Sequence, residues 1–318
     1  MRPVVSVVIA CRNAERTLGV QLAALARQNC PVPWNVVISD NGSTDGTVAV
    51  ARGFASRLPG LVVVDSSGRL GAGHARNVGC QATEAPLLVF CDADDEAAPG
   101  WLAAMVETLR QDQFVAGQFE SDKLNRPRVL RSRSLQQSDG LQESSFGPGL
   151  PHAGAGNLGV RREVFFRVGG FDPVVGCLED TDLCWRIQLD GVPLVFSPEA
   201  VMQVRLRSSL RTIWAQGCAY GAATALLEHR YPANGVSPLL PWRAITTGQP
   251  AVPPASRHPL RRPAAGWGAK LLELIRDQRS FGSLVWTLGW HVGHRRQPPV
   301  SAILPTRDRA LDTMLFPR

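Results

Sequence analysis

The stretch that decides the fold of this chain is Pro86-Leu87-Leu88-Val89-Phe90-Cys91-Asp92-Ala93-Asp94-Asp95. Its apolar start, residues 86–90, is short and uninterrupted, a pattern typical of a strand buried on both faces of a parallel sheet. The carboxylates that follow stand at the carboxyl end of this strand, where open α/β sheets bind ligands. Asp92 and Asp94 offer hard oxygen ligands, which suit Mg²⁺ or Mn²⁺ and, through them, phosphate groups. The motif alone leaves open a simpler interpretation, an acidic turn that caps a helix beginning near Pro99.

Three more apolar runs precede this strand and alternate with helical patterns. The runs cover residues 4–10, 36–38 and 61–64. The helical patterns cover residues 14–28, a segment capped by Ser43 or Thr44 that extends to Leu58, and residues 73–82. Four strands that alternate with helices predict an α/β fold, with a mostly parallel, Rossmann-like sheet flanked by helices and joined by right-handed crossovers.

The second half of the chain has a different pattern. Residues 119–151 are polar and predict a long connection or mobile loop, and long loops in compact domains are often functional lids. Regular patterns then return, and helices are expected over residues 162–168, from Glu179 onward, and over 209–229, 266–278 and 281–293.

The composition is that of a soluble globular protein, with 44% hydrophobic and 19% charged residues. No apolar stretch reaches the roughly 18 residues that span a bilayer. The first residues run straight into a strand pattern, so a signal peptide is not expected. The seven cysteines are odd in number and scattered, which favours reduced thiols in a cytoplasmic protein over disulfides or a zinc site.

The net charge of +7 is unevenly distributed. Residues 201–318 carry 16 Arg or Lys against five Asp or Glu, whereas residues 1–200 have a small acidic excess. A basic tail suggests an anionic partner, or simply a solvated surface. Nucleic acid is not the expected partner, because the sequence has no helix-turn-helix pattern and no basic segment with interleaved aromatic residues.

The segment from Ser280 to Gly293 is apolar, contains two Trp residues and is followed by His294-Arg295-Arg296. It is too short to span a bilayer, but a helix of this composition can lie in the membrane interface, with Trp at headgroup depth and Arg on anionic lipid. We expect peripheral contact with the inner face of the plasma membrane. Packing of this helix against the rest of the protein is the alternative.

Two residues outside the acidic turn are candidates for binding a nucleotide. Asp40 ends the second strand and could accept the imide N–H of uracil or thymine, although a turn-forming Asp is common at such a position. The glycines before Arg76 make a poor dinucleotide fingerprint, since they follow the third strand and Arg stands where the last glycine belongs. Arg76 is better assigned to a diphosphate, as a planar fork of donors, unless the segment is a simple helix start.

The segment Glu179-Asp180-Thr181-Asp182 opens a predicted helix. Glu179 and Asp180 stand at its N-terminus, where the helix dipole keeps a carboxylate ionised and competent as a general base. Helix capping is the simpler interpretation. Asp182 and Arg186 form an i,i+4 pair on one face of the helix, which favours a structural role for both.

In this order and spacing, the motifs resemble those of the family 2 glycosyltransferases over about residues 4–225. The resemblance rests on six segments: Val5–Asn13, Val36–Thr47, Ala75–Gly79, Asp92–Asp95, Gly169–Asp172 and Glu179–Leu183. It implies the GT-A fold with a helical C-terminal extension. It also implies inverting transfer of a single sugar, of the hexosyl type, from a UDP- or dTDP-linked donor to a glycan or lipid-linked acceptor, in cell-envelope, polysaccharide or glycolipid synthesis. Inversion needs a base and an electrophilic clamp on the leaving diphosphate, and no nucleophile on the protein.

On the donor side, the resemblance implies that Asp40 binds the nucleotide base. The backbone around Ala10 and Arg12 would border the nucleoside, and Arg76 would help with the diphosphate. Asp92 would contact the ribose or a metal-bound water. These residues would form a nucleotide-sugar-binding part within residues 1–100.

For the leaving diphosphate, the resemblance implies that Asp94 ligates the divalent cation. On the acceptor side, it implies that Asp180 deprotonates the acceptor hydroxyl. Acceptor or supporting roles would fall to Glu179, Asp182 and Arg186. On this division the catalytic domain covers residues 1–230, with the acceptor and base part in 150–230. Residues 231–318 would be a basic, partly helical extension.

Two departures from the family pattern matter. Relatives often carry a metal-binding His after the Glu-Asp helix, but the matching position here is Val204, and no His lies between residues 153 and 228. The cation is then expected to rely on Asp94, the diphosphate and water, or to bind weakly. The segment Arg211–Gln216 does not match the motif of processive members, which favours transfer of a single sugar.

Two other functions remain open. A nucleotidyltransferase would need a glycine-rich basic loop after the first strand, and Cys11–Ala14 lacks one. A non-catalytic relative that binds nucleotide sugars is favoured by the missing His and opposed by the presence of Asp92, Asp94 and Asp180.

Overall fold

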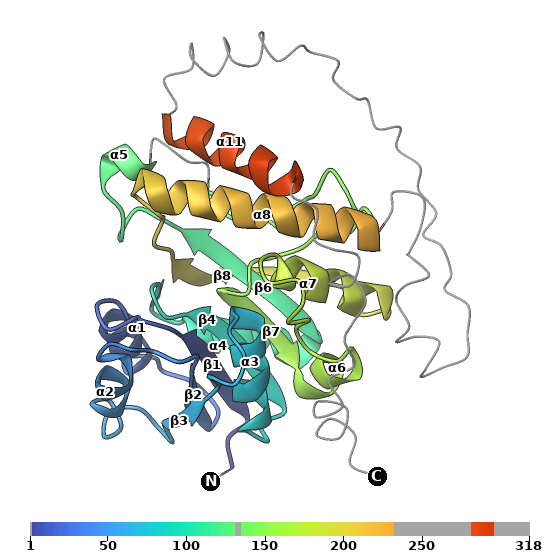
Figure 1. Ribbon diagram of the computed structural model, residues 1–318. Helices are drawn as coiled ribbons and strands as arrows, with labels where there is room; N and C mark the ends of the chain where they lie inside the picture. The colour runs from blue at the N-terminus through green and yellow to red at the C-terminus, as the bar shows by residue number, and fades with distance from the viewer. Residues whose placement is uncertain (1, 131–134, 232–280, 296–318) are drawn as a thin grey trace.

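An eight-stranded sheet runs through the computed structural model, which describes residues 2–130, 135–231 and 281–295 (Figure 1). The strands are β1 (Val5–Cys11), β2 (Trp34–Asp40), β3 (Val62–Asp65), β4 (Leu87–Asp92), β5 (Glu96–Ala97), β6 (Phe114–Glu120), β7 (Asn157–Arg161) and β8 (Val195–Gln203). The helices are α1 (Leu18–Leu25), α2 (Thr47–Arg52), α3 (Ala72–Gln81), α4 (Trp101–Gln111), α5 (Pro127–Leu130), α6 (Arg162–Arg167), α7 (Glu179–Leu189), α8 (Leu210–Arg230) and α11 (Phe281–Arg295).

The order of the strands across the sheet is β3-β2-β1-β4-β7-β6-β8-β5. Strands β1 to β4 are parallel and are joined through α1, α2 and α3. Strand β7 runs antiparallel between β4 and β6, β8 is parallel to β6, and β5 pairs antiparallel with β8. The prediction of a mostly parallel α/β sheet is confirmed, and β7 and β5 are its antiparallel members.

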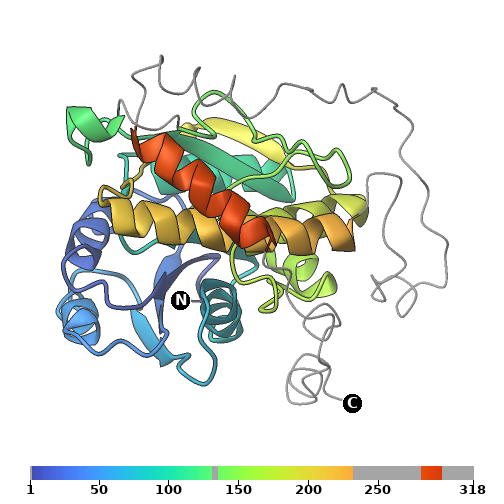
Figure 2. The same cartoon turned by 45° about the horizontal axis from the view of Figure 1, so that its top comes forward.

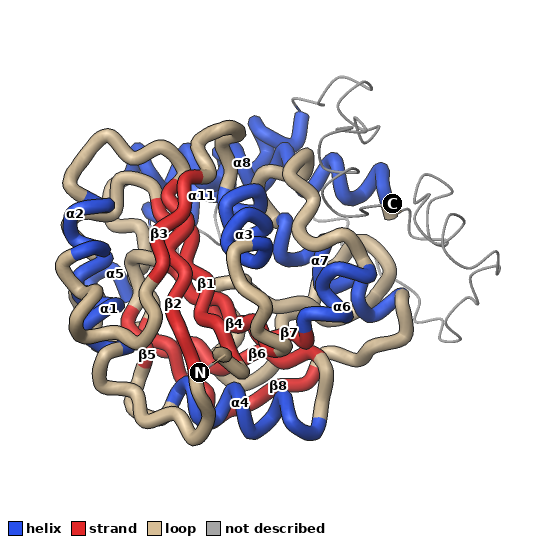
Figure 3. Tube along the Cα trace, turned by 90° about the horizontal axis from the view of Figure 1, so that it is seen from below, coloured by secondary structure: helices blue, strands red, loops and turns tan. Residues whose placement is uncertain are grey.

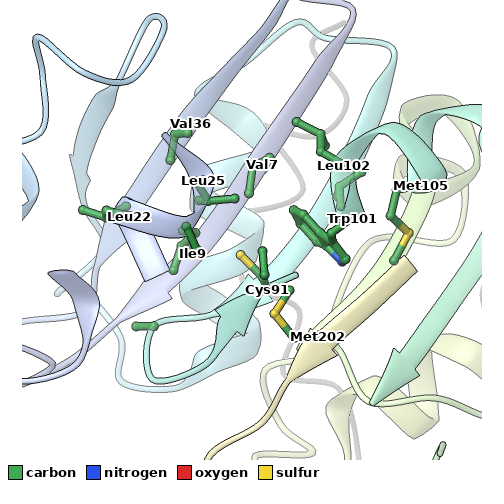
Figure 4. Close-up of a cluster of buried hydrophobic side chains, with 14 of the residues drawn as sticks. Val7, Ile9, Leu22, Leu25, Val36, Cys91, Trp101, Leu102, Met105 and Met202 are labelled. Carbon is green, nitrogen blue, oxygen red and sulfur yellow. The ribbon is translucent and has the colours of Figure 1, made fainter. Parts of the chain in front are cut away.

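Helices cover both faces of the sheet (Figure 3). Side chains alternate along β1, so that Val7 and Ile9 pack with α1, α2 and α4, whereas Val8 packs with α3, α6 and α7. Trp101 of α4 is fully buried and fills the first of these cores beside Met202 of β8 (Figure 4). Because both faces are covered, the central strands are apolar throughout, which is the pattern that made them visible in the sequence.

Two strands from the second half of the chain, β6 and β8, contain residues that interrupt a strand pattern in the sequence. Strand β6 contains Gly117, next to which its register with β8 shifts, and β8 contains Pro198 and Glu199. An added Cβ at Gly117 would lie 2.5 Å from the side-chain amide nitrogen of Asn157, so this position has no room for a side chain. Close contact of backbone with a neighbouring side chain explains the glycine.

The long polar connection is fastened to the sheet in its second part. It starts at the end of β6, includes α5, and forms one bridge between Gln142 and His152. Gln137 is buried, donates from Nε2 to the Gly117 carbonyl at 2.7 Å and accepts the Gly154 N–H at 2.8 Å. The predicted long connection is therefore present, with one short helix that the sequence did not indicate.

Several predicted helices are shorter than expected. Helix α1 begins at Leu18 and not at residue 14, α2 ends at Arg52 and not at Leu58, and α4 begins at Trp101. The predicted caps Ser43 and Thr44 are wrong, because α2 begins after Gly46 and Asp45 accepts the Thr47 N–H at 3.1 Å. Ser43 accepts the Asn13 N–H, and the Thr44 N–H is donated to Asn13 Oδ1, so these residues tie the loops after β1 and β2 together.

The helices of the last part fit the predictions better. Helix α8 starts after Ser209, whose side chain accepts the Thr212 N–H at 3.2 Å, and α11 covers the predicted 281–293 segment. The helix predicted over 266–278 lies outside the described residues. Within the described ranges, no helix is long and apolar enough to cross a membrane.

Helix α11 lies along α8 (Figures 1 and 2). The two helices are parallel, because Trp286 lies beside Tyr220, Trp290 donates to Thr224 and His294 pairs with Glu228. Packing of this helix against the rest of the protein, the alternative left open by the sequence, is what the structure shows.

The contact between α8 and α11 is made by four glycines, which we call the glycine seam: Gly217 and Gly221 of α8, and Gly289 and Gly293 of α11. An added Cβ at Gly289 would lie 2.7 Å from the Trp214 carbonyl oxygen, and one at Gly293 would overlap the Cys218 carbonyl oxygen. Small residues spaced four apart let two helix backbones approach closely, which is the arrangement seen here.

The glycine seam should not accept even one methyl group. We expect Gly293→Ala to separate α11 from α8 and to lower the free energy of unfolding by about 1–3 kcal/mol, the usual cost of overpacking. Urea unfolding measures the loss, and acrylamide quenching of tryptophan fluorescence reports the exposure of Trp286 and Trp290. Gly140→Ala is the matched control, because nothing lies within 4 Å of its added Cβ. Equal stability of the two variants would show that the seam is not closely packed.

Candidate active site

The residues that the sequence predicts to bind the nucleotide lie at one edge of the sheet, at the carboxyl ends of the parallel strands. Ala10 of β1 is paired with Ser39 of β2 and with Asp92 of β4, and Cys11 is paired with Asp40. Because these strands run parallel, their carboxyl ends lie at the same edge of the sheet. Arg12 follows β1 directly and is exposed.

Asp40 is 9% exposed, and one of its carboxylate oxygens can still accept a hydrogen bond. Its Oδ2 accepts the Ser43 N–H at 3.2 Å, whereas its Oδ1 is buried and has no hydrogen-bond partner among the described residues. A buried acceptor without a donor costs free energy, so such a group is expected to be satisfied by a ligand or by water.

Three carboxylates gather at the end of β4. One oxygen each of Asp92, Asp94 and Asp95 lies within 4.8 Å of the others. Burial, and after it the charge of Asp92, raises the pKa of Asp94, and the same two causes raise the pKa of Asp95 well above its usual value. Backbone groups hold the cluster in place, since Asp95 accepts the Arg205 N–H at 2.9 Å.

The cluster fits a divalent cation by the chemistry of its donor set. Several carboxylate oxygens and no sulfur or imidazole are the ligands that Mg²⁺ and Mn²⁺ prefer. The cluster also lies against Gly156, where an added Cβ would be 2.8 Å from Asp92 Oδ2, so the backbone of the chain closes one side of it.

Arg76 joins this cluster to the start of α7. Its guanidinium is 5% exposed, and it donates to Asp92 Oδ1 and to Glu179 Oε1, each at 2.8 Å. Its Nε has no partner among the described residues. The Phe171 ring lies under the guanidinium, with 5.3 Å between CZ and the ring centroid, and Asn77 exchanges two hydrogen bonds with the Phe171 backbone.

Asp180 and Glu179 have different surroundings in the first turn of α7. Asp180 is half-buried and accepts the backbone N–H of Ala155 at 3.1 Å and that of Thr181 at 2.8 Å. Glu179 is buried, and this burial, together with the charge of Asp180, raises the pKa of Glu179 to about 7 even though Arg76 opposes the shift. The pair therefore places a half-buried carboxylate beside one whose pKa is raised to about 7.

The turn before α7 is strained. Leu178 has φ of 66° and ψ of 22°, a left-handed conformation that costs a non-glycine residue about 1–2 kcal/mol. The Asp182 N–H donates to the Leu178 carbonyl at 3.0 Å, which closes the first turn of the helix. Strain of this kind persists where the surrounding structure fixes the backbone, and it often lies beside functional groups.

A cavity of about 460 Å³ lies beside the start of α7, and its volume is typical of small-molecule sites. Asp92 and Asp180 both line it, so the end of β4 and the start of α7 face the same space. The other side is formed by α8 and by the segment before it. The remaining lining residues are Arg76, Cys177, Leu178, Glu179, Arg207, Thr212, Ala215, Gln216 and Tyr220.

Asp182 and Arg186 do not line this cavity. Asp182 is fully buried and accepts from Arg186, from Arg230 and from the Tyr231 hydroxyl at 2.8–2.9 Å. Burial alone would raise the pKa of Asp182, but the charges of Arg186 and Arg230 bring it below its usual value. The predicted i,i+4 pair is confirmed, and it belongs to a buried network that fixes α7 to the end of α8.

The structure adds site residues that the sequence did not indicate. Asp95 belongs to the acidic cluster, and Arg207 lines the cavity, as do Thr212, Gln216 and Tyr220 of α8. The signal for Asp95 was present in the acidic turn. The α8 residues had no such signal in the sequence, because they reach the cavity beside Asp180 only through the tertiary placement of α8.

Comparisons with known proteins agree with this geometry. The family model described as Glycosyl transferase family 2 matches residues 6–169. The pre-mycofactocin glycosyltransferase of Mycobacterium tuberculosis is 30% identical over 169 residues, which are 51% of this chain and 36% of that protein. The succinoglycan biosynthesis protein ExoA of Rhizobium meliloti is 27% identical over 248 residues, which are 74% of this chain and 73% of that protein.

A solved structure extends the likeness to the whole fold. The mannosyltransferase PcManGT of Pyrobaculum calidifontis, in complex with GDP-Man and Mn²⁺, superposes with a TM-score of 0.60 and 20% identity, covering 93% of this chain and 88% of that one. The chain spans between 23% and 36% of the length of several curated relatives that it matches. Since the family model covers more than half of the chain, and the fold is the GT-A fold of solved glycosyltransferases, this chain belongs to glycosyl transferase family 2.

Proposed function

We propose that the chain is an inverting glycosyltransferase that moves a single sugar, of the hexosyl type, from a nucleotide-diphosphate sugar to an acceptor hydroxyl. The observation that carries this proposal is that Asp92 of the acidic cluster and Asp180 of α7 line one cavity. A displacement with inversion needs a base on one side of the reacting carbon and a stabilised leaving group on the other. On this proposal, residues 1–230 form the catalytic domain, with donor binding in 1–100 and the base in 150–230, followed by the extension over 231–318.

The donor half is assigned to the edge of the sheet. We assign the nucleotide base to Asp40, whose unpartnered Oδ1 can accept one N–H, with the backbone of Ala10 and Arg12 beside the nucleoside. Uracil and thymine present a single imide N–H, whereas guanine presents two donors, and Asp40 Oδ2 is already engaged with Ser43. A UDP- or dTDP-linked donor therefore suits this carboxylate better than a GDP-linked one.

The diphosphate of the sugar donor is assigned to the acidic cluster and to the cation that this cluster would hold. Asp94 would hold Mg²⁺ or Mn²⁺, with Asp92 beside the ribose or a metal-bound water; the cation, when bound, supplies positive charge to the leaving diphosphate. Arg207 is exposed at the cavity and offers a further donor to the phosphate oxygens. Arg76 keeps its assignment to the diphosphate, although two carboxylates already hold it. The solved relative in complex with GDP-Man and Mn²⁺ supports a donor of this class.

The base is assigned to Asp180. Its carboxylate faces the cavity and is oriented by two backbone N–H groups, so it can take the proton of an acceptor hydroxyl without a change in its own position. Glu179, paired with Arg76, supports this arrangement from the buried side. We place Asp182 and Arg186 behind the site, where they support α7.

Family membership weakens the two competing functions. A nucleotidyltransferase would not be expected to match the family model over residues 6–169. A non-catalytic relative would not need Asp180 to be held beside the cavity by backbone donors. Turnover of a nucleotide sugar in the presence of Mn²⁺ separates all three functions.

The acceptor side suggests contact with an anionic membrane at the inner face of the plasma membrane. Leu210 and Trp214 of α8 are 48% and 40% exposed, and Leu288 of α11 is 44% exposed. The exposed Arg207 and Arg211 lie in the same part of the chain. Apolar side chains beside arginines favour an anionic lipid surface, and so a lipid-linked acceptor for the cell envelope or a polysaccharide. The succinoglycan biosynthesis protein among the relatives agrees with this context.

Removal of the proposed metal ligand should abolish cation-dependent nucleotide binding. We expect UDP with Mn²⁺ to raise the melting temperature of the protein more than GDP with Mn²⁺, and Asp94→Ala to lose the Mn²⁺-dependent part of the shift. The fold should remain intact, because Asp94 is only partly buried and belongs to no core cluster. An unchanged Mn²⁺ dependence in Asp94→Ala would contradict the assignment.

Loss of the proposed base should separate binding from turnover. Asp180→Asn keeps the shape of the side chain but cannot take a proton, so UDP binding should survive while release of UDP from a nucleotide sugar slows by roughly 10²-fold or more.

The neighbouring carboxylate provides the control for this experiment. In the unmodified protein the rate should fall as the pH drops through about 7, because protonation of Glu179 weakens its pairing with Arg76. Glu179→Gln, which is neutral at every pH, should lack this inflection and turn over at the reduced rate that the unmodified protein has below pH 7. If Glu179→Gln is inactive and Asp180→Asn is active, the base has been assigned one residue too late.

The membrane proposal is tested by flotation with phosphatidylcholine vesicles that contain or lack phosphatidylglycerol. We expect the protein to float only with the anionic vesicles, less so at high salt, and Leu288→Glu to weaken flotation. Val20→Glu, at a position that is 38% exposed on α1, is the matched control. Equal flotation of both variants, or none by the unmodified protein at low salt, would refute membrane contact through this surface.

A further inference from the structure

His152 is a buried histidine that the proposed mechanism does not use. It stands at the end of the long connection, in the bridge with Gln142, and is 8% exposed. Both of its ring nitrogens have partners: Nδ1 lies 3.2 Å from Thr181 Oγ1, and Nε2 lies 2.9 Å from Ser144 Oγ. The edge of the Trp185 ring packs against it, with 6.2 Å between the ring centroids.

These contacts place His152 between the two segments that hold Asp180. The carboxylate of Asp180 accepts from the N–H of Thr181, whose side chain meets His152, and from the N–H of Ala155, three residues after His152 in the chain. One imidazole therefore links the first turn of α7 to the backbone that orients the carboxylate from the other side.

The charge state of His152 suits this position. Burial lowers the pKa of His152, and the nearby charge of Asp180 opposes the shift without overcoming it. A neutral imidazole has one donor and one acceptor nitrogen, and the two hydroxyl partners can match either arrangement.

We propose that His152 is a positioning residue for Asp180, which holds the carboxylate toward the cavity through its hydrogen bond to Thr181. This inference rests on the proposed function, in which Asp180 is the base. It assigns a role to a residue of the long connection, which the sequence marks only as a polar segment. His152 is not among the residues that line the cavity, so we expect its loss to act on the rate and not on the affinity for the sugar donor.

Two substitutions of His152 separate its two hydrogen bonds. The amide of Asn can occupy the place of Nδ1 and keep the bond to Thr181, whereas the amide of Gln reaches the place of Nε2 and keeps the bond to Ser144. We expect His152→Asn to retain most of the kcat of UDP release from a UDP-sugar. His152→Gln and Thr181→Val should lower kcat by roughly tenfold to a hundredfold with KM unchanged, since a displacement of about 1 Å has effects on this scale.

The pattern of these variants decides the proposal. Ser138→Ala is the control and should behave like the unmodified protein, because the Ser138 hydroxyl lies in the same connection and donates to the exposed Asp139. The double variant His152→Gln with Thr181→Val should be no slower than either single variant, because both substitutions remove the same hydrogen bond, the one between His152 and Thr181. Equal kcat in His152→Asn and His152→Gln, or a loss that appears in KM, would overturn the proposal.

A second measurement does not depend on turnover. The imidazole of His152 can be titrated by NMR, with its signal identified from His152→Asn. In Asp180→Asn we expect its pKa to fall further, because the carboxylate that favours the imidazolium is gone. An unchanged titration would refute the link between the two residues. A protein with the expected titration that turns over no nucleotide sugar would contradict the proposed function and leave the pairing of His152 with the Asp180 segment standing.

Discussion

Repulsion between buried carboxylates is the constraint on which the rest of the site depends. Five acidic side chains stand at the end of β4 and the start of α7, and three of them, Asp92, Glu179 and Asp180, line one cavity. The five cannot all keep their charge without compensation. The compensating donors come from distant parts of the chain: Arg76 from α3, and Arg205 and Arg207 from the segment after β8. The acidic edge is stable only when the whole sheet is assembled around it, and a cation would relieve the charge that remains.

The buried network around Asp182 fixes the position of α7. Asp182 holds Arg186, Arg230 and Tyr231 in a region without solvent, and removal of one partner from such a network typically costs about 3–5 kcal/mol. Its effect is to fix α7 against the end of α8, so that the first turn of α7 has one position. The strained Leu178 and the oriented Asp180 carboxylate are the result of this fixation, and a site that is organised before the substrate binds loses less free energy on binding.

The sequence predicted the parts of this molecule whose pattern is local. Strands β1, β2 and β4 were recognisable because both faces are buried and their runs are apolar, and Asp40 and Asp92 follow from the ends of those strands. Strand β3 lies at the edge of the sheet and is partly exposed, but its three Val residues still form an apolar run. Strands β6 and β8 were missed because Gly117, Pro198 and Glu199 interrupt the pattern for reasons that lie in neighbouring elements. The cavity residues of α8 could not be predicted, since no local sequence pattern indicates which helix lines the same cavity as Asp180.

The glycine seam also bears on how the molecule folds. Two glycines within α8 cost that helix about 1–2 kcal/mol of intrinsic stability, so α8 gains much of its stability from contact with α11. The end of α8, Arg230, and the start of α11, Phe281, are far apart in the chain, and these two ends must come together before this contact can form. Contacts of such long sequence separation form slowly. We therefore expect the α8 side of the cavity to be completed after the sheet, as one of the last steps in folding.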